Sequence, residues 1–361
     1  MSRLAIIADD LTGALDAAAP FAHHGPVEVG IRCLPSGSPA AVTIDTETRD
    51  VELGTALSAL RHALLILDES ELRLKKIDSL LRGNTFREIA ACWSSGLFGS
   101  MVVAPAFPAE GRITRCGHQM VAGDVGVDMA GRLAELGIAV CVRARGVEAR
   151  GEGVFLCDAD SDADLAAIAA FDGLAPPVLW CGSAGLAHAL AGRGTAEPLH
   201  GKRRLLIVGS RHAATLGQVE HLQRARAGIV SLIADPTDAE RAIDNAAANL
   251  EGGGRAALIF DIAGQEPALA ADLQRRVFAR LSQLRPPDLV AVTGGETLVR
   301  LCDATHARRL VVTGEWRPGI AVAVLGEGTW RGTTVVGKSG GFGTPDVLTQ
   351  LMQPNEWTRP S

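Results

Sequence analysis

The sequence predicts an α/β protein of two domains, each built on a largely parallel sheet, with the active site in the cleft between them. Short apolar stretches that read as strands alternate with stretches rich in Ala, Leu, Glu, Gln and Arg that read as helices, as in α/β layers. The chain has 361 residues, whereas single cores stop growing at about 250–300 residues. With 47% hydrophobic residues, it can fill two buried cores.

In the first half, strands are expected at residues 4–8, 42–45, 72–77, 101–104 and 178–181. A helix is expected at residues 162–171. In the second half, strands are expected at residues 205–208, 229–232, 256–260, 289–293, 309–313 and 335–337. Helices are expected at residues 213–225, 238–250 and 267–283, because their side chains lose little freedom in a helix. This order of elements predicts parallel sheets.

The expected domain boundary is the segment 191–202, which is polar, contains glycine and proline, and precedes a new strand. It separates a first domain, residues 1–195, from a second domain, residues 202–352.

Composition excludes several classes of protein. The net charge is −6, with 35 basic and 41 acidic residues mixed along the chain, and no basic tract indicates a nucleic-acid partner. No uncharged apolar run approaches the ~20 residues that a membrane helix needs. The seven cysteines are an odd number without a Cys-x-x-Cys pair, which favours free thiols and a cytoplasmic location. A homo-oligomer is compatible with the sequence, which does not disclose the oligomeric state.

Two glycine-rich loops in the second half follow apolar runs, at residues 293–297 and 337–343. Because glycine lacks a Cβ, backbone N–H groups there can converge on an anion. Lys338 adds a mobile positive charge for terminal phosphates. The loops indicate a nucleotide-phosphate site, although tight turns between strands would also account for the glycines. Neither loop fits the Walker or Rossmann glycine pattern, so the type of nucleotide stays open.

Asp9 and Asp10 end the first expected strand, just before a helix that begins near Thr12. Ligands of open α/β sheets bind beyond the carboxyl ends of the strands. A carboxylate there can accept a proton from a substrate hydroxyl or help to hold Mg²⁺. The alternative is that an aspartate only caps the helix.

Polar residues also follow other strands of the first half. The segment 75–84 contains two lysines on opposite faces of a strand, so only one can reach a given site. Arg82 in this segment can bind a carboxylate with two hydrogen bonds, although a solvated charged turn would have the same composition. The segments 45–49 and 104–112 each end in an arginine that could bind an anion. Ser210, in a small-residue turn, could donate to a phosphate or simply stabilise that turn. The first half is therefore expected to hold a small acid and the second half a nucleotide.

In order along nearly the whole chain, these motifs resemble those of the four-carbon acid sugar kinases. The matching segments are residues 7–14, 45–49, 75–84, 105–112, 182–186, 209–210, 294–297 and 338–343. Two features depart from the family pattern. The chain is shorter than typical members between residues 121 and 153, and residues 112–118 replace the usual Arg-Thr-Thr opening. Both departures lie in the substrate half, so they bear on substrate identity.

The resemblance implies phosphorylation of a hydroxyl on an acid such as threonate, erythronate or 2-oxotetronate, with ATP and Mg²⁺. It places the substrate contacts on Asp9, Asp10, Arg49, Lys76, Asp78, Ser79 and Arg82. Asp10 or Asp78 would be the catalytic proton acceptor. It places the nucleotide contacts on Ser210, Gly294, Gly295, Glu296, Lys338, Ser339, Gly340, Gly341, Phe342 and Gly343. It assigns no metal ligands.

Two other functions would use some of the same sequence features. A non-catalytic protein that binds nucleotide or sugar acid would need the same loops, but adjacent carboxylates do not help a pure binder of anions. A dinucleotide-dependent dehydrogenase would also carry glycine loops, but the first strand lacks the Gly-x-Gly-x-x-Gly sequence after it.

Overall fold

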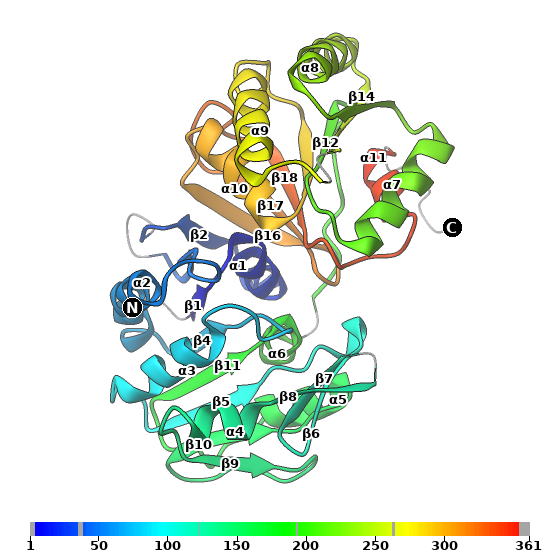
Figure 1. Cartoon of the computed structure of the whole chain (residues 1–361). Coiled ribbons are helices and arrows are strands. Elements are labelled where there is room, and N and C mark those ends of the chain that lie inside the picture. Colours follow the sequence, from blue (N-terminus) through cyan, green and yellow to red (C-terminus); the bar gives the residue numbers. More distant parts are fainter. Residues whose placement is uncertain (1–3, 35–38, 122, 193, 262–263, 354–361) are drawn as a thin grey trace, which may run out of the picture. The chain divides into compact units, whose positions relative to one another are not determined.

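The computed structural model of the chain describes residues 4–353 except 35–38, 122, 193 and 262–263. The chain divides into two compact units, residues 1–195 and 196–361. Each unit is an α/β fold around its own mostly parallel sheet, which confirms the predicted fold class (Figure 1).

The N-terminal unit is built on a sheet with the strand order β2-β3-β1-β4-β11-β5-β10-β9, in which all neighbours are parallel. Its strands are β1 (Leu4–Ala8), β2 (Val27–Ile31), β3 (Ala41–Asp45), β4 (Leu72–Lys76), β5 (Ser100–Ala104), β9 (Val140–Arg143), β10 (Gly153–Cys157) and β11 (Val178–Gly182). A small antiparallel sheet is formed by β6 (Arg112–Arg115), β7 (His118–Val121) and β8 (Asp124–Asp128).

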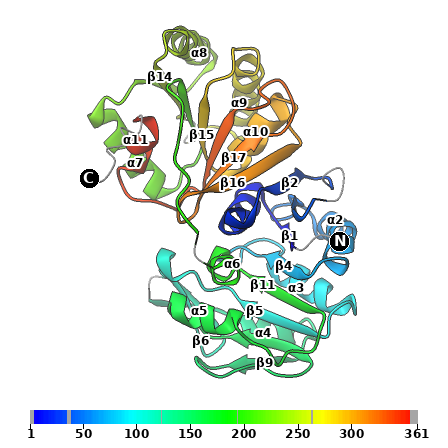
Figure 2. The same ribbon diagram turned by 180° about the vertical axis from the view of Figure 1, so that it is seen from behind.

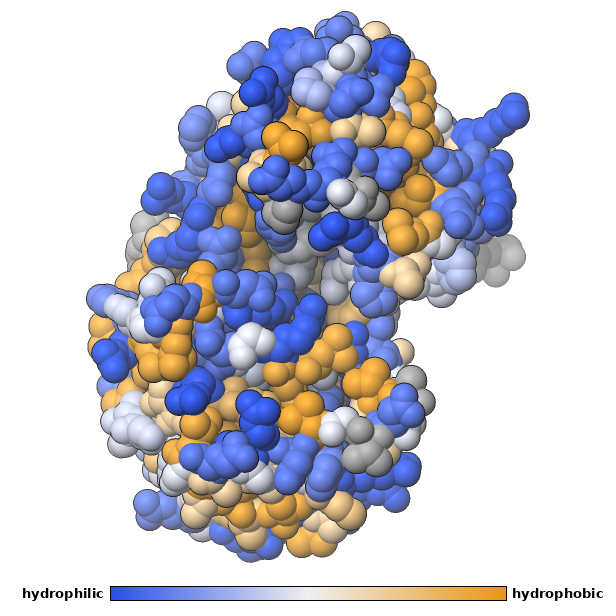
Figure 3. Space-filling view, in the orientation of Figure 1, coloured by the Kyte–Doolittle hydropathy of each residue, from blue (hydrophilic) through white to orange (hydrophobic). Residues whose placement is uncertain are grey.

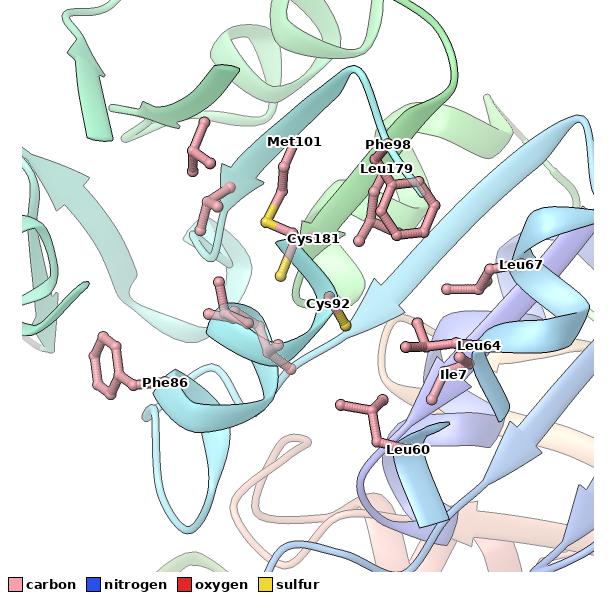
Figure 4. Packing of buried hydrophobic residues seen from close by; sticks show 14 of the residues in the cluster. Ile7, Leu60, Leu64, Leu67, Phe86, Cys92, Phe98, Met101, Leu179 and Cys181 are labelled. Carbon is pink, nitrogen blue, oxygen red and sulfur yellow. The ribbon is translucent and has the colours of Figure 1, made fainter. Parts of the chain in front are cut away.

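Helices cover both faces of the parallel sheet in this unit. They are α1 (Leu11–Ala18), α2 (Leu53–Asp68), α3 (Thr85–Ser94), α4 (Met129–Ala134), α5 (Asp162–Ala169) and α6 (Ala184–Ala191), with 3-10 turns η1 (Ala19–His24) and η2 (Pro108–Glu110). Figure 4 shows part of the core, where Leu60, Leu64 and Leu67 of α2 lie near Ile7 of β1. Their spacing puts the three leucines on one face of the helix, which buries that face.

The C-terminal unit has the strand order β13-β14-β12-β15-β18-β17-β16. The strands are β12 (Arg204–Val208), β13 (Ile229–Ile233), β14 (Arg255–Phe260), β15 (Leu289–Thr293), β16 (Arg309–Arg317), β17 (Ile320–Leu325) and β18 (Thr334–Lys338). The neighbours from β13 to β18 are parallel, and β17 is antiparallel to both β18 and β16.

The helices of this unit are α7 (Ala213–Ala225), α8 (Pro236–Glu251), α9 (Pro267–Leu281), α10 (Gly295–Ala304) and α11 (Val347–Met352). In both ribbon views α7 lies beside α11, and α9 and α10 lie on the other side of the sheet (Figures 1 and 2). The apolar side chains of α7 and α11 pack onto β12, β14 and β15 as a second core.

All the expected strands and helices are present, and the expected helix 213–225 has the observed bounds of α7. The sequence did not predict the strands β2, β9, β10 and β17 or the small sheet. The apolar runs of β10 and β17 were visible in the sequence, whereas β6 and β7 are short and rich in polar residues. Such strands give little periodic signal.

Two further expectations can be compared with the structure. Each of the seven cysteines is a free thiol. Within the described residues, no helix has both the length and the apolar character needed to cross a membrane. Figure 3 shows hydrophilic and apolar residues intermixed on the visible face.

Candidate functional site

Three polar loops of the N-terminal unit lie together because their strands are neighbours. Strands β3, β1 and β4 are adjacent and parallel, with Ala8 paired to Asp45 on one side and Lys76 on the other. The segments that follow them, residues 9–10, 46–49 and 77–82, therefore leave the sheet at one edge. The structure thus brings together Asp9, Asp10, Arg49 and Asp78, as the sequence predicted for a ligand site at strand ends.

Arg49 binds both aspartates that follow β1. Its Nε donates to Asp9 Oδ2 over 3.0 Å and its Nη2 donates to Asp9 Oδ1 over 2.8 Å. The same Nη2 donates to Asp10 Oδ1 over 2.6 Å. Burial alone would raise the pKa of Asp9, but the charges of Arg49 and two lysines outweigh it, and the pKa lies below its usual value. Asp9 is therefore an ionised carboxylate held in a fixed orientation.

The backbone fixes the turn that carries Arg49. The N–H groups of Thr48 and Arg49 donate to the carbonyl of Asp9, at 3.0 and 3.1 Å. On the other side, the Asn84 amide donates to the carbonyl of Thr48 over 2.8 Å. Gly83 has a φ of +64°, and a Cβ there would lie 2.1 Å from the carbonyl oxygen of Arg49. The loop after β4 therefore packs directly on the loop after β3, and this contact requires glycine.

Asp10 caps the N-terminus of α1, which is the alternative role that the sequence suggested for an aspartate here. Its Oδ1 accepts from the N–H of Gly13 over 3.0 Å, and its Oδ2 accepts from the Thr12 hydroxyl over 2.7 Å. Because Oδ1 also accepts from Arg49, capping and participation in the charged cluster occur together. The side chain keeps 19% of its surface exposed, against 4% for Asp9. Of the two, Asp10 is the carboxylate that a ligand could reach more easily.

The two lysines of β4 point to opposite faces of the sheet, as alternation predicts. Lys75 is fully buried and its Nζ lies 2.7 Å from Glu88 of α3. Burial opposes the charge of Lys75, yet the paired Glu88 raises its pKa above the usual value. Lys76 lies on the other face, where its Nζ donates to the carbonyl of Ile77 over 3.0 Å and comes close to Gly13. Lys76 is therefore the lysine on the same side as Asp10.

Asp78 and Arg82 form an ion pair with each other. Arg82 Nε donates to Asp78 Oδ2 over 2.6 Å, and Nη2 donates to Oδ1 over 3.0 Å. Burial works against ionisation, but Arg82, Arg49 and Lys76 together hold the pKa of Asp78 well below its usual value. The side chain of Arg82 remains 58% exposed. Arg82 thus binds a carboxylate of the protein itself, a contact that the sequence did not predict.

The small sheet brings Arg112, which the sequence indicated as a possible anion-binding residue, to the loop after β4, together with Thr114 and Gln119, which the sequence did not indicate. Arg112 Nη1 donates to the hydroxyl of Ser79, and the buried Gln119 donates from Nε2 to the carbonyl of Ser79 over 2.9 Å. Gln119 is itself held by the hydroxyl of Thr114, at 2.9 Å from Oε1. The loop after β4 is therefore fixed by β6 and β7. The sequence could not predict the contact between Gln119 and Ser79, because the acceptor is a backbone carbonyl 40 positions away.

Asp45 is a fully buried carboxyl at the end of β3. Its Oδ1 accepts from the N–H of Glu47 over 2.9 Å, whereas its Oδ2 has no hydrogen-bond partner within the described residues. Burial raises the pKa of Asp45 well above its usual value, and neighbouring carboxylates raise it further. Through its contact with Glu47, the buried Asp45 shapes the turn leading to Arg49.

In the C-terminal unit, three loops meet for the same topological reason. Strands β12, β15 and β18 are adjacent and parallel, so residues 209–210, 294–295 and 339–343 follow them at one edge. The N–H of Gly294 donates to the carbonyl of Lys338 over 3.0 Å. A Cβ on Gly340 would lie 2.1 Å from Ser210 Oγ. The two glycine loops therefore contact each other, and Ser210 packs against the second of them.

Three residues of the predicted nucleotide set differ from their expected roles. Lys338 is fully buried and its Nζ donates to the carbonyl of Ser339 over 2.9 Å, so it is not a mobile surface charge. Glu296 is mostly exposed and pairs with Arg300 one turn along α10. Phe342 is buried against Gly319 and anchors the loop. Residue type alone could not distinguish these orientations.

Metal ligation was left open by the sequence. Among the residues that the structure describes, no group of three or more His, Cys, Asp or Glu side chains could hold a metal ion.

Comparison with known proteins assigns a family to the chain. Residues 4–135 match the family model described as a sugar-binding N-terminal domain, and residues 205–348 match the one described as a nucleotide-binding C-terminal domain. The D-threonate kinase of Cupriavidus necator is 32% identical, with 96% of this chain and 97% of the relative covered. The chain belongs to the four-carbon acid sugar kinase family.

A second relative, the D-threonate kinase of Bordetella bronchiseptica, is 30% identical over 97% of this chain and 96% of its own. The alignment with the Cupriavidus necator kinase has 408 positions, more than the 361 residues of this chain. That relative therefore has segments that this member of the family lacks. A solved structure from Salmonella typhimurium LT2 shares the fold, with a TM-score of 0.75, 18% identity, and 97% of this chain and 98% of that chain covered.

Proposed function

We propose that this member of the family is an ATP-dependent kinase that phosphorylates a hydroxyl of a four-carbon sugar acid such as threonate, erythronate or 2-oxotetronate. The observation that carries the proposal is the pair of strand-end clusters. One gathers aspartates and arginines in the unit that matches a sugar-binding domain, and the other gathers glycine loops in the unit that matches a nucleotide-binding domain. The D-threonate kinase relatives support this substrate class.

The carboxylate of the acid is proposed to bind Arg82 in preference to Arg49. A guanidinium has five N–H donors. Arg49 uses three of them on Asp9 and Asp10, and only 12% of its side chain is exposed. Arg82 uses two on Asp78 and is 58% exposed, so its outer edge can still bind a substrate carboxylate. Lys76, the last residue of β4, and Ser79, on the loop that follows, would contact the hydroxyl groups.

The proton of the reacting hydroxyl is proposed to pass to Asp10. Phosphoryl transfer needs mainly positioning, charge neutralisation and one proton acceptor. Burial raises the pKa of Asp78, but the ion pair with Arg82 outweighs this effect and holds the pKa below its usual value. Asp78 is therefore a poor base. Asp10 is more exposed than Asp9, and Asp10 Oδ1 and Lys76 Nζ both lie close to Gly13. Asp78 then orients Arg82 and the substrate.

ATP is proposed to place its phosphates on residues 339–343 and Gly294, with Ser210 beside them. The glycine backbone there leaves room for close approach of an anion. Lys338, buried beneath the loop, adds positive charge under it. Mg²⁺ typically binds through phosphate oxygens, water and one or two carboxylates, which fits a protein whose described residues form no metal cluster of their own. When bound, Mg²⁺ would neutralise charge on the phosphates.

A coupled assay of ADP release tests the proposal. The purified protein is supplied with ATP, Mg²⁺ and, one at a time, the stereoisomers of threonate and erythronate and 2-oxotetronate. ADP release that depends on one or a few of these acids is the expected result. Binding of ATP and acid without ADP release would indicate the non-catalytic alternative. A response of NADH fluorescence in place of ATP binding would indicate a dehydrogenase.

A further inference from the structure

Two side chains of α7 hold the backbone of the glycine loop that follows β18. Thr215 Oγ1 donates to the carbonyl of Gly340 over 2.6 Å. Gln218 Nε2 donates to the carbonyls of Phe342 and Gly343, each over 3.0 Å. Thr215 and Gln218 are three positions apart, so they lie on one face of the helix. Both are buried.

These contacts determine where the N–H groups of the loop point. In a planar trans peptide, the carbonyl and the following N–H point in opposite directions, and among the described residues the one cis bond is Pro176–Pro177. Because α7 holds the carbonyls of Gly340, Phe342 and Gly343, the N–H groups that follow them point away from α7. These are the N–H groups of Gly341, Gly343 and Thr344.

The three N–H groups have no partner in the part of the chain that the structure describes. No hydrogen bond is donated by the backbone N–H of Gly341, Gly343 or Thr344, whereas the N–H of the intervening Phe342 donates to Ser339. Three donors on one short loop, all directed away from α7, can bind an anion together. The loop is also tied at Gly340, where Ser210 leaves no room for a Cβ.

We propose that Thr215 and Gln218 are positioning residues that orient the amides of Gly341, Gly343 and Thr344 toward the phosphates of the nucleotide. The inference rests on the proposed nucleotide site and adds to it two residues that do not touch the ligand. These two residues could not be identified from the sequence, because a Thr and a Gln inside a helix are usually polar surface residues.

The test compares four variants with the wild-type protein. Thr215→Val and Gln218→Met keep side-chain size but remove the donors, and the net worth of such hydrogen bonds predicts a rise of up to about tenfold in the KM for ATP. The KM for the acid should stay unchanged. Thr215→Ser keeps the hydroxyl and should restore the wild-type value. Val219→Ala, on the same helix and also buried, is the control that lowers stability without removing a donor.

Hydrogen exchange of the wild-type protein is the second measurement and does not depend on the folding of a variant. ADP should slow exchange of the Gly341, Gly343 and Thr344 amides more than that of Phe342. If ATP turnover is normal but Thr215→Val and Gln218→Met behave as Val219→Ala does, the positioning role is wrong while the proposed function stands. If ADP binds without slowing exchange at the three amides, the orientation argument is wrong. If the wild-type protein binds no nucleotide, the proposed function and this inference both fall.

Discussion

Arg49 and Asp9 form a bidentate ion pair in the N-terminal unit, with the guanidinium Nε and Nη2 at 3.0 and 2.8 Å from the two carboxylate oxygens. The pair joins the loops after two neighbouring strands, and its Nη2 extends the contact to Asp10. Because this geometry needs two N–H groups of one planar guanidinium, lysine cannot reproduce it. The main task that the structure gives to Arg49 is to hold the two aspartates.

Replacing Arg49 by lysine should therefore affect stability as well as activity. Losing charged hydrogen bonds to Asp9 and Asp10 is expected to lower the free energy of unfolding by about 1.5–3 kcal/mol. Urea unfolding measures this change. A matched Arg61→Lys variant, on α2 and exposed, should have little effect. If Arg49→Lys is as stable as the wild type, the ion pair does not hold the loops together.

Arg82→Lys should weaken binding of the sugar acid and leave ATP binding intact. Removal of a bidentate contact with a carboxylate is worth roughly 1.5–3 kcal/mol, or about ten- to a hundredfold in the KM for the acid. Steady-state kinetics with each substrate varied in turn separates the two effects. A change confined to the KM for ATP would show that the two units have been assigned to the wrong ligands.

Asp10→Asn should lose most turnover while the fold and ATP binding remain. Asparagine caps a helix about as well as aspartate, so α1 should keep its cap. The amide cannot accept the proton, which is expected to lower kcat by roughly 10²–10⁴-fold. Asp78→Asn should mainly raise the KM for the acid, because it releases Arg82. Near-normal turnover in both variants would leave positioning alone as the mechanism.

Asp45→Asn should stabilise the protein, and more so as the pH rises. Because burial raises the pKa of Asp45 well above its usual value, the folded state keeps a proton that the unfolded state releases above about pH 4. The contribution of Asp45 to the free energy of unfolding therefore falls as the pH rises. Asparagine removes this pH dependence and keeps the Oδ1 acceptor for the N–H of Glu47. Thermal unfolding between about pH 5 and pH 8 measures the difference between variant and wild type. A difference that shrinks with rising pH would mean that Asp45 is ionised.

Gly341→Val should lower ATP affinity while the fold survives. A side chain at this position would occupy space that the phosphates need. Gly340 is not suitable for this test, because a Cβ there would lie 2.1 Å from Ser210 Oγ and would disturb the loop itself. Isothermal titration with ATP compares the Gly341→Val variant with the wild type. Equal affinities in a folded variant would contradict the placement of the phosphates.

The sequence predicted which loops carry polar residues but not how these residues pair. Asp9 and Asp10 could be placed at a strand end because an apolar run precedes them, and Asp78 because it follows the expected strand 72–77. That β3, β1 and β4 are neighbours is a property of the sheet order, and so the pairing of Arg49 with Asp9 could not be predicted. The burial of Lys338 likewise depends on which face of β18 is covered.

Side chains that donate to distant backbone carbonyls could not be predicted, for a different reason. Gln119 and Gln218 donate to carbonyls that lie 40 or more positions away in the chain. Carbonyls are present at every residue, so the sequence contains no partner type to search for. The helix that carries Gln218 was predicted with the observed bounds, whereas the direction in which its side chain points depends on the packing of the loop after β18.

The central claim is phosphoryl transfer from ATP to a four-carbon sugar acid. Mass spectrometry of the acid after incubation with the protein, ATP and Mg²⁺ tests it most directly, with the Asp10→Asn variant run in parallel. We expect the acid to gain one phosphoryl group in step with ADP formation, and the variant to form little of this product. ADP formation without a phosphorylated acid, or binding of both ligands with no product from the wild-type protein, would contradict the claim.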